Sequence, residues 1–460
     1  MYPRIAVFLE FDFLYPGVSC VAKIVPIHKK FFLVLGGIMV LCVALTIASI
    51  IYISVVCGTD SFAGSEDDNL PGSSLLNCYY YNILPAAEQK LYLSVLLAAE
   101  KCASMTEPID REYTPDEYKN VMLALTADHP RLFYIDIDNT LLQTAKGKSR
   151  IILSYYASVE EISNMQEKLS LAVTSILDKA EQSANDDPEK EIKLTDLGEF
   201  ERELLLHDFF CDAVSYYEKR DIGYGDDMLE TGNPETESEN LPADDGQIPT
   251  DIDRLLADTA YGALVGGKAF SGGYAMGIKY LLNSAGIMCD VVRGTADGSP
   301  HMWNIVYIDG KFYHLDSTYN DGDIEFAPEL RFHGYFNLSS ESIKMDHTID
   351  REEILPVAQQ EYDYYHAKGL IAENLMELDR IAYREVLNAV YSGKNYIELY
   401  PTFSREGDSF KADLLNVISR VNKNQDKSEL KVVFRVYNAS ATNNALTIQL
   451  FYVTHEDDVN

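Results

Sequence analysis

Residues 301–319 read HMWNIVYIDGKFYHLDSTY, and this stretch decides the central fold. Apolar and polar residues alternate on both sides of Asp309-Gly310, a dipeptide typical of a two-residue hairpin turn. The natural register around such a turn places Ile308 opposite Lys311. The sequence therefore predicts an antiparallel β-hairpin whose two strands continue to the ends of the quoted stretch.

The same register brings two functional side chains together. His301 and Asp316 fall on one face of the hairpin as diagonal neighbours, with backbones about 7–8 Å apart. A carboxylate at that spacing can hold one ring nitrogen of the histidine and leave the other facing a nucleophile. The alternative is a solvent-facing histidine beside an unrelated aspartate.

The segment before the hairpin, residues 266–287, reads GGKAFSGGYAMGIKYLLNSAGI. Glycine-rich sequence passes here into a predicted amphipathic helix, and Ser271 lies at its start. Serine is a good helix N-cap and needs no other role at this position. A helix N-terminus also stabilises an oxyanion or lowers the pKa of a thiol, so the position is equally suited to a nucleophile.

Together, residues 265–321 resemble the core of the bacterial transglutaminase-like superfamily, which has a papain-type fold. In that family a Cys-x-Gly-Tyr-Ala element opens a buried helix. A strand ending in Val-x-Gly, a His-Ala-Trp-Asn element, an Asp-Gly hairpin turn and Asp-x-Thr follow. The positions that match here are Gly273, Tyr274, Ala275, Val292, Gly294, His301, Trp303, Asn304, Asp316 and Thr318. A looser likeness extends from about residue 78 to about residue 365.

The resemblance implies an α+β fold in which a helix packs on an antiparallel sheet. It implies His301 as base and Asp316 as the residue that orients it. It also implies a substrate cleft, whose residues would be Gly272, Gly273, Tyr274, Trp303 and Asn304. Neither a cofactor nor a metal is expected.

The departure from the family lies at the nucleophile, because its cysteine falls on Ser271. Cys289 follows in the next strand, where a buried structural cysteine is expected. A thiolate already paired with imidazolium attacks an amide readily, whereas a serine hydroxyl must lose its proton during the attack. Replacing a nucleophile that acts as a unit with its base usually costs several orders of magnitude in rate.

Two hypotheses follow. The substitution favours a non-catalytic or weakened peptide-binding or scaffold protein that keeps the cleft. The alternative is an active acyl-transfer enzyme (peptidase, amidase or transglutaminase-type) that uses a Ser271-His301-Asp316 triad on protein or cell-wall peptides.

Residues 31–57 predict a transmembrane helix, because they are apolar, carry no charged residue and exceed the roughly 20 residues that cross a bilayer core. Lysines precede the segment and acids follow it, so residues 1–30 are expected in the cytoplasm and the rest outside the cell. A cleaved signal peptide or lipid attachment at Cys57 fits less well. We therefore expect a single-pass protein of the cell membrane with an extracellular C-terminal part.

The chain has a net charge of −34, so nucleic acid is not an expected partner. Its expected partners are a protein or cell-wall peptide, and the membrane through its one helix. Four of the seven cysteines follow the apolar segment, which allows at most two disulfides.

Beyond the core, helices are expected at 85–102, from 115, and at 159–181, 195–218 and 373–391, with strands at 132–137 and 326–338. A final run of strand, helix and two strands occupies 396–403, 410–424, 430–437 and 445–453. The predicted organisation is a 58–74 linker, a helical N-terminal part over 75–220, an acidic loop over 221–249, the transglutaminase-like core over 250–365, and a small C-terminal α/β module over 370–460.

Overall fold

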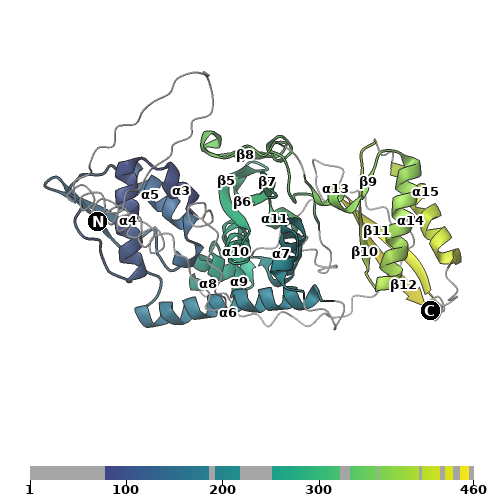
Figure 1. Cartoon of the computed structure of the whole chain (residues 1–460), viewed down its shortest axis with the longest axis horizontal. Coiled ribbons are helices and arrows are strands. Elements are labelled where there is room, and N and C mark those ends of the chain that lie inside the picture. The colour runs from purple at the N-terminus through teal and green to yellow at the C-terminus, as the bar shows by residue number, and fades with distance from the viewer. Residues whose placement is uncertain are drawn as a thin grey trace, which may run out of the picture. The chain divides into compact units, whose positions relative to one another are not determined.

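The computed structural model describes residues 78–185, 192–217, 251–321, 332–359, 362–403, 407–424, 430–438 and 446–454. These residues belong to one compact unit of mixed helix and sheet, an α+β fold (Figure 1). None of the described helices combines the length and the apolar character that a membrane span needs. The predicted span 31–57, the 58–74 linker and the acidic 221–249 loop lie outside the described residues.

A four-stranded antiparallel sheet in the order β7-β6-β5-β8 carries the candidate site. Its strands are β5 (Met288–Ala296), β6 (Ser299–Ile308), β7 (Lys311–Leu315) and β8 (His347–Ile349). The predicted turn and register are confirmed: Ile308 pairs with Lys311, and the pairing runs on to Asn304 opposite Leu315. The second strand is shorter than predicted, because Asp316 caps a helical turn over Ser317–Asn320 and the chain leaves the sheet after Leu315.

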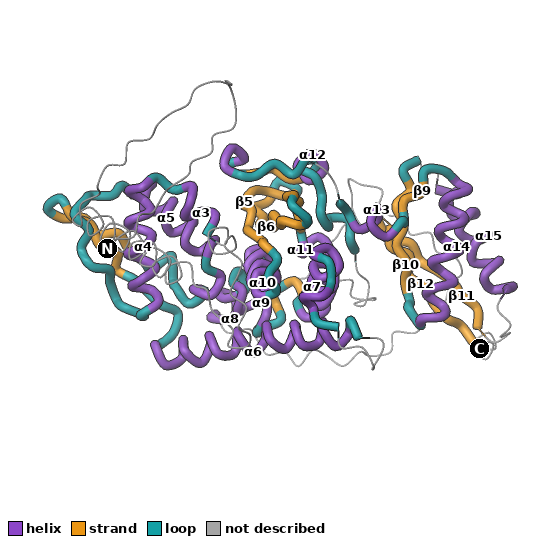
Figure 2. Tube along the Cα trace, viewed as in Figure 1, coloured by secondary structure: helices purple, strands orange, loops and turns teal. Residues whose placement is uncertain are grey.

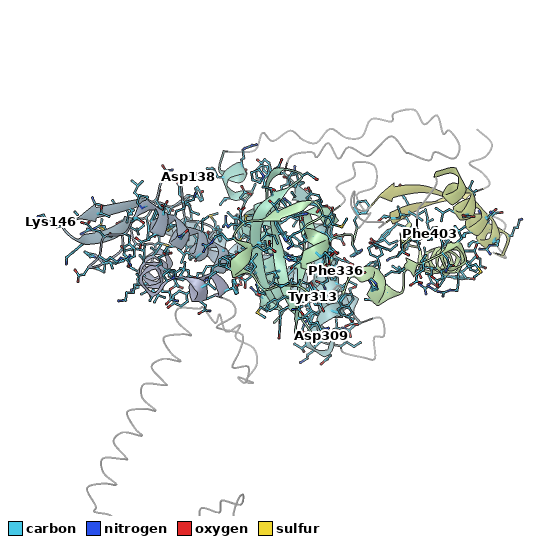
Figure 3. All side chains as sticks on the ribbon, turned by 90° about the horizontal axis from the view of Figure 1, so that it is seen from above. Asp138, Lys146, Asp309, Tyr313, Phe336 and Phe403 are labelled. Carbon is cyan, nitrogen blue, oxygen red and sulfur yellow. The ribbon has the colours of Figure 1, made fainter. Side chains whose placement is uncertain are left out.

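The turn of this hairpin has the geometry that its sequence requires. Asp309 and Gly310 have φ values of 49° and 84°, which glycine adopts without strain and aspartate tolerates. Asp309 is exposed at the turn, whereas Tyr313 of β7 and Phe336 of the following segment are buried (Figure 3).

Helix α10 (Ser271–Ser284) packs against β5 and β6, as predicted for the segment that begins at Ser271. The helix was predicted to be amphipathic, but every residue from Gly272 to Lys279, together with Leu281 and Leu282, is buried, so other elements cover it on nearly every side. One buried position is charged. Lys279 donates to the carbonyl of Ala127 across 2.7 Å and also to Asp290 of β5.

The N-terminal part of the described chain is mainly helical. Its longer helices are α4 (Ala86–Glu100), α5 (Pro115–Asp128), α6 (Val159–Ser183) and α7 (Glu199–Ala213). Thr114 and Ser158 begin α5 and α6 with capping boxes, which explains why these boundaries could be read from the sequence. Its shorter elements are α3 (Tyr79–Ile83), η1 (Pro130–Leu132), η2 (Leu194–Asp196) and β3 (Ser215–Tyr216).

The strand expected at 132–137 is wrong. Residues 130–132 form a 3-10 turn, and Ile135 makes only an isolated bridge to Tyr155. Leu132, Phe133, Tyr134 and Ile135 are all buried, so the segment does not alternate between core and solvent as a half-buried strand would. A hairpin of β1 (Leu141–Ala145) and β2 (Lys148–Ile152) follows it.

The final part of the chain matches the predicted strand, helix and two strands. These are β10 (Tyr396–Pro401), α15 (Gly407–Asn424), β11 (Leu430–Asn438) and β12 (Leu446–Thr454), with α14 (Leu375–Ser392) ahead of them. The sheet order is β11-β12-β10-β9, where β9 is Ile371–Ala372, and α14 and α15 lie beside these strands (Figure 2). This part has its own hydrophobic cluster, which includes Ile381, Leu399, Val417 and Ile448.

The segment expected as a strand at 326–338 is described only from residue 332, and there a single bridge joins Leu338 to His314. The remaining elements are short; they are α8 (Asp251–Leu256), α9 (Ala260–Leu264), β4 (Lys268–Ala269), α11 (Ser317–Asn320), α12 (Ser340–Ile343), η3 (Glu352–Ile354) and α13 (Tyr364–Lys368). The four described cysteines, Cys78, Cys102, Cys211 and Cys289, are thiols that are not joined in disulfides.

Candidate functional site

Ser271 is the first residue of α10, and the preceding residue, Phe270, occupies the N-cap position without a side-chain cap. The interpretation of Ser271 as the N-cap is therefore wrong. Phe270 holds the helix start through its backbone, since its N–H donates to Ala257 O at 2.9 Å. Ser271 is half-buried and borders the cavity described below, so its hydroxyl is available for a role other than capping.

Asp258 lies beside this helix start and accepts a hydrogen bond from the backbone N–H of Gly272. Burial raises the pKa of Asp258, and the Gly272 N–H and the charge of Arg293 oppose that rise. One of the free N–H groups at the start of α10 is therefore already used by a carboxylate.

His301 of β6 and Asp316, which follows β7, meet as their predicted positions on the hairpin require. His301 Nε2 donates to Asp316 Oδ2 across 2.7 Å. The histidine is 8% exposed and the aspartate is fully buried. Because Nε2 is used by the carboxylate, Nδ1 is the ring nitrogen left to face a substrate or a nucleophile.

Asp316 is held by four donors. Its Oδ1 accepts from the N–H groups of Thr318 and Tyr319 at 2.9 and 3.2 Å, which makes it the N-cap of α11. Its Oδ2 accepts from His301 and, at 3.1 Å, from Nε2 of His347. Burial alone would raise the pKa of this carboxyl, but the two imidazoles and their hydrogen bonds hold it well below its usual range.

His347 is the residue that sequence reasoning missed. It begins β8, which pairs with β5, so its approach to Asp316 depends on contacts between segments far apart in the chain. Its Nδ1 donates to Asp346 while its Nε2 donates to Asp316. The two hydrogen bonds to carboxylates outweigh the effect of burial and raise the pKa of His347 to about 9. The available signal was the Asp-His-Thr tripeptide at 346–348, which contains no spacing rule that pairs it with the hairpin.

A cavity of about 1070 Å³ borders Ser271 and His301. Aromatic, apolar, acidic and basic side chains line it. Three of its aromatic and three of its charged residues are Phe133, Tyr156, Phe270, Arg254, Asp258 and Arg293. A volume of this size accepts a peptide segment or a drug-sized ligand.

The predicted cleft residues lie in two different environments, one at the cavity and the other in the buried interior. Gly272 lines the cavity, whereas Gly273, Tyr274, Trp303 and Asn304 are buried and are not among its lining residues. Asn304 donates to the carbonyls of Ala275 and Asp290 at 2.9 and 3.2 Å, and the Tyr274 hydroxyl donates to Asp321. These two side chains therefore join α10 to its neighbours.

Trp303 lies beneath the site and does not form a wall of the cleft. It is 1% exposed, and its Nε1 donates to His314 Nδ1 at 3.1 Å. Gly294 gives it room, since a Cβ at that position would lie 2.9 Å from the Trp303 ring and 1.8 Å from Thr348 O. The ring of Trp303 stacks on that of His301, with centroids 6.1 Å apart, and so supports the base from below.

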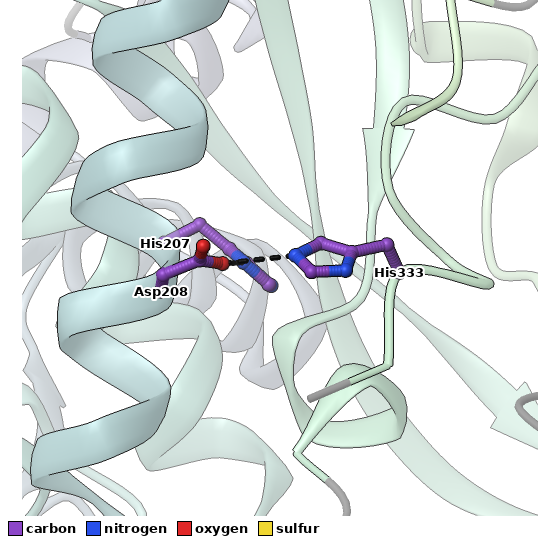
Figure 4. A group of neighbouring side chains, drawn as sticks. All are labelled: His207, Asp208 and His333. Carbon is purple, nitrogen blue, oxygen red and sulfur yellow. Dashed lines mark hydrogen bonds and ion pairs between the residues drawn. The ribbon is translucent and has the colours of Figure 1, made fainter. Parts of the chain in front are cut away.

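Two groups of side chains bring metal-binding atom types within 4.8 Å of one another. One is His301, Asp316 and His347; the other is His207, Asp208 and His333, where α7 faces the segment that carries His333 (Figure 4). In each group one histidine donates from both ring nitrogens to carboxylates: His347 as above, and His333 to Asp208 and Glu398 at 2.9 and 2.8 Å. A ring that donates from both nitrogens is protonated and has no lone pair for a metal, so the hydrogen bonding favours imidazolium in both groups.

No protein-family model matches the sequence, and no curated protein matches it either. Among solved structures, the fold is similar to a crystal structure of a TGase, with 14% identity, a TM-score of 0.21, and coverage of 46% of this chain and 50% of that one. It is also similar to a putative protease from Parabacteroides distasonis, with 12% identity, a TM-score of 0.18, and coverage of 38% of this chain and 35% of that one. The chain thus spans half or less of the length of these two neighbours.

Proposed function

We propose that this protein is a serine-dependent acyl-transfer enzyme of transglutaminase-like type that acts on peptide amides or esters. Ser271 is the nucleophile, His301 the general base and Asp316 the residue that orients the base. The observation that carries the proposal is that Ser271 and His301 border one cavity, while the far nitrogen of His301 is fixed by a buried carboxylate.

The chemistry follows from the orientation of His301. Its Nδ1 accepts the hydroxyl proton as Ser271 Oγ attacks the substrate carbonyl carbon. The bond to the leaving amine or alcohol then breaks, and His301 returns the proton to that group, leaving an ester on Ser271. Water or a second amine attacks this ester, its proton passes to His301, and His301 returns that proton to Ser271 Oγ as the product leaves.

The substrate class is a peptide or protein, including cell-wall peptides. The cavity volume and its mixture of aromatic rings with charges of both signs suit a peptide segment. The apolar segment at 31–57 would place such a site outside the cell on a membrane anchor.

A second candidate is a peptide-binding protein without turnover, and the position of Asp258 favours it. This carboxylate uses the Gly272 N–H at the start of α10, which reduces the donors available to stabilise an oxyanion at Ser271. Under this hypothesis the cavity binds a peptide, and Ser271 only contributes to its surface.

Hydrolysis of an activated ester, p-nitrophenyl acetate, by the purified full-length protein separates the two candidates. The enzyme hypothesis predicts that Ser271→Ala and His301→Gln each lower the rate by at least about 100-fold. Ser284→Ala is the matched control, because its hydroxyl lies at the other end of α10 and donates to Tyr280 O at 2.7 Å. Equal rates for all four proteins would contradict the enzyme hypothesis and leave the binding hypothesis.

A further inference from the structure

A second cavity, of about 430 Å³, lies beside the candidate site and has no role in the chemistry above. It is bordered by α3, the start of α4, α5 and the segment around η3, and most of its lining is apolar, with Leu84, Leu123 and Leu355 among the side chains. Arg293 and Asp350 line this cavity and the larger one as well. The two cavities are therefore neighbours.

Glu88 is the lining residue of this cavity that its own surroundings serve least well. It stands in the first turn of α4 and is only 7% exposed. Its Oε2 has no hydrogen-bond partner among the described residues. An acid in the first turn of a helix is favourable, but that interaction does not require burial. A buried carboxylate oxygen without a donor costs free energy, and a ligand in the cavity can supply the missing donor.

The charged groups near Glu88 do not remove this cost. Burial raises the pKa of Glu88, and the charge of Glu117 raises it further; together they outweigh Arg351, Arg111 and the amide of Asn120, which lower it. Neither arginine hydrogen bonds to Oε2, since Arg111 donates to Glu117 and the exposed Arg351 leaves Oε2 without a donor. A cation placed in the cavity would stabilise the ionised carboxylate.

We propose that the 430 Å³ cavity is a second binding site, which takes a primary ammonium group at the end of an aliphatic chain, with Glu88 as its counter-ion. The apolar walls cover the chain, as apolar surface does for a lysine stem. A single unpartnered oxygen suits the point charge of an ammonium group better than the planar fork of a guanidinium, which binds a carboxylate through two parallel hydrogen bonds. A lysine side chain and a free alkylamine both present this chemistry.

The inference goes beyond the proposed function, because the ammonium group is bound and does not react. An amine that is paired with a carboxylate keeps its proton, and so it has no lone pair with which to attack an ester. The site therefore selects ligands by their charge. Arg293 at the border of the cavities does not exclude a cation, since Asp258 and Asp350 oppose its charge. The net charge of −34 also favours cationic ligands.

Calorimetry with peptides tests lysine as the source of the ammonium group. The full-length Ser271→Ala protein, which cannot turn over a peptide, is titrated with capped alanine hexapeptides that carry one lysine at each position in turn. Matched peptides carry norleucine, which has the same aliphatic chain without the charge. At one position lysine is expected to bind at least about tenfold more tightly than norleucine. Glu88→Gln is expected to abolish that preference.

Glu160→Gln is the matched control for Glu88→Gln, because it removes the same charge from an exposed position in the first turn of α6. It is expected to keep the preference for lysine. A preference that survives Glu88→Gln would overturn the inference, because lysine would then be bound elsewhere.

Urea unfolding with n-butylammonium chloride tests a free amine as the source, with 1-butanol as the uncharged ligand of similar length. The amine is expected to raise the free energy of unfolding of the wild type more than the alcohol does, and Glu88→Gln is expected to remove the difference. If no peptide binds, the proposed peptide substrate fails, and this measurement still decides the inference. No Glu88-dependent effect of either lysine or n-butylammonium would overturn it.

A lysine built into the cavity tests the need for a cation without any ligand. Asn120 lines the cavity on α5, and its amide already acts on Glu88. Asn120→Lys is therefore expected to give a higher free energy of unfolding than Asn120→Met, which has a flexible chain without the charge. The advantage is expected to vanish in the Glu88→Gln background. Equal stability of Asn120→Lys and Asn120→Met would contradict the role of Glu88 as a counter-ion.

Discussion

The ammonium group of Lys279 donates to the carboxylate of Asp290, although the lysine is fully buried and the aspartate is 5% exposed. This pair joins α10 to β5, and therefore joins the helix that begins at Ser271 to the sheet that carries His301. Burial would lower the pKa of Lys279, but the carboxylates of Asp290 and Asp128 outweigh it and raise that pKa. The charged lysine is thus part of the support beneath the site.

Removing the lysine should destabilise the protein strongly. Lys279→Met leaves Asp290 buried without its partner, so we expect the free energy of unfolding to fall by about 3–5 kcal/mol. Adding Asp290→Leu should recover much of that loss, because the unpaired charge is then removed as well. Urea unfolding measures these values, with Lys119→Met on the exposed face of α5 as the control. A loss in Lys279→Met no larger than in the control would contradict this account.

Changing the acid of the triad should lower the rate of ester hydrolysis strongly. Asp316→Asn turns an amide N–H toward one of the imidazoles, which favours the wrong tautomer of His301, and we expect ester hydrolysis to fall by about 10³-fold or more. Asp309→Asn at the exposed hairpin turn, where φ is 49°, should leave the rate unchanged. Circular dichroism of the two variants checks that their folds are equal. Retention of most activity by Asp316→Asn would show that this carboxylate does not orient the base.

The buried imidazolium of His333 should make the free energy of unfolding decrease as the pH rises into the alkaline range. His333 is bonded to Asp208 and Glu398, whose charges outweigh burial and raise its pKa to about 10. The folded pKa lies above the unfolded value of about 6.5, so this contribution is fully present below pH 6.5 and is lost as pH rises toward 10.

Comparison with His333→Gln isolates that contribution. We expect the wild type to be more stable at pH 6.5 by on the order of 3 kcal/mol, because the variant leaves Glu398 buried without its cation. The difference should shrink steadily between pH 7 and pH 10, as measured by urea unfolding at a series of pH values. A difference that stays constant over this range would mean that the charge on His333 does not contribute.

Local signals account for the parts of the structure that could be predicted. The Asp309-Gly310 turn sets the register of its two strands, and that register carries His301 to Asp316. Capping boxes at Thr114 and Ser158 mark the starts of two helices, and clear periodicity marks the strands and helices after residue 373.

The parts that could not be predicted depend on contacts between distant segments. His347 reaches Asp316 because β8 pairs with β5, and no local pattern encodes that pairing. Trp303 was expected in the cleft wall, but the space beside Gly294 allows its ring to pack beneath the site. Residues 132–135 read as an alternating strand because their composition is apolar and aromatic, whereas burial of all four side chains removes the distinction between two faces.

The central claim is that His301 activates Ser271 for attack on a carbonyl. Labelling of the full-length protein with a fluorophosphonate probe, followed by peptide mass spectrometry, tests it most directly. The account predicts a single phosphonyl adduct on Ser271, absent from Ser271→Ala and from His301→Gln and retained by Ser284→Ala. Folded wild-type protein that acquires no adduct at Ser271, or a His301→Gln protein labelled as fast as wild type, would contradict it.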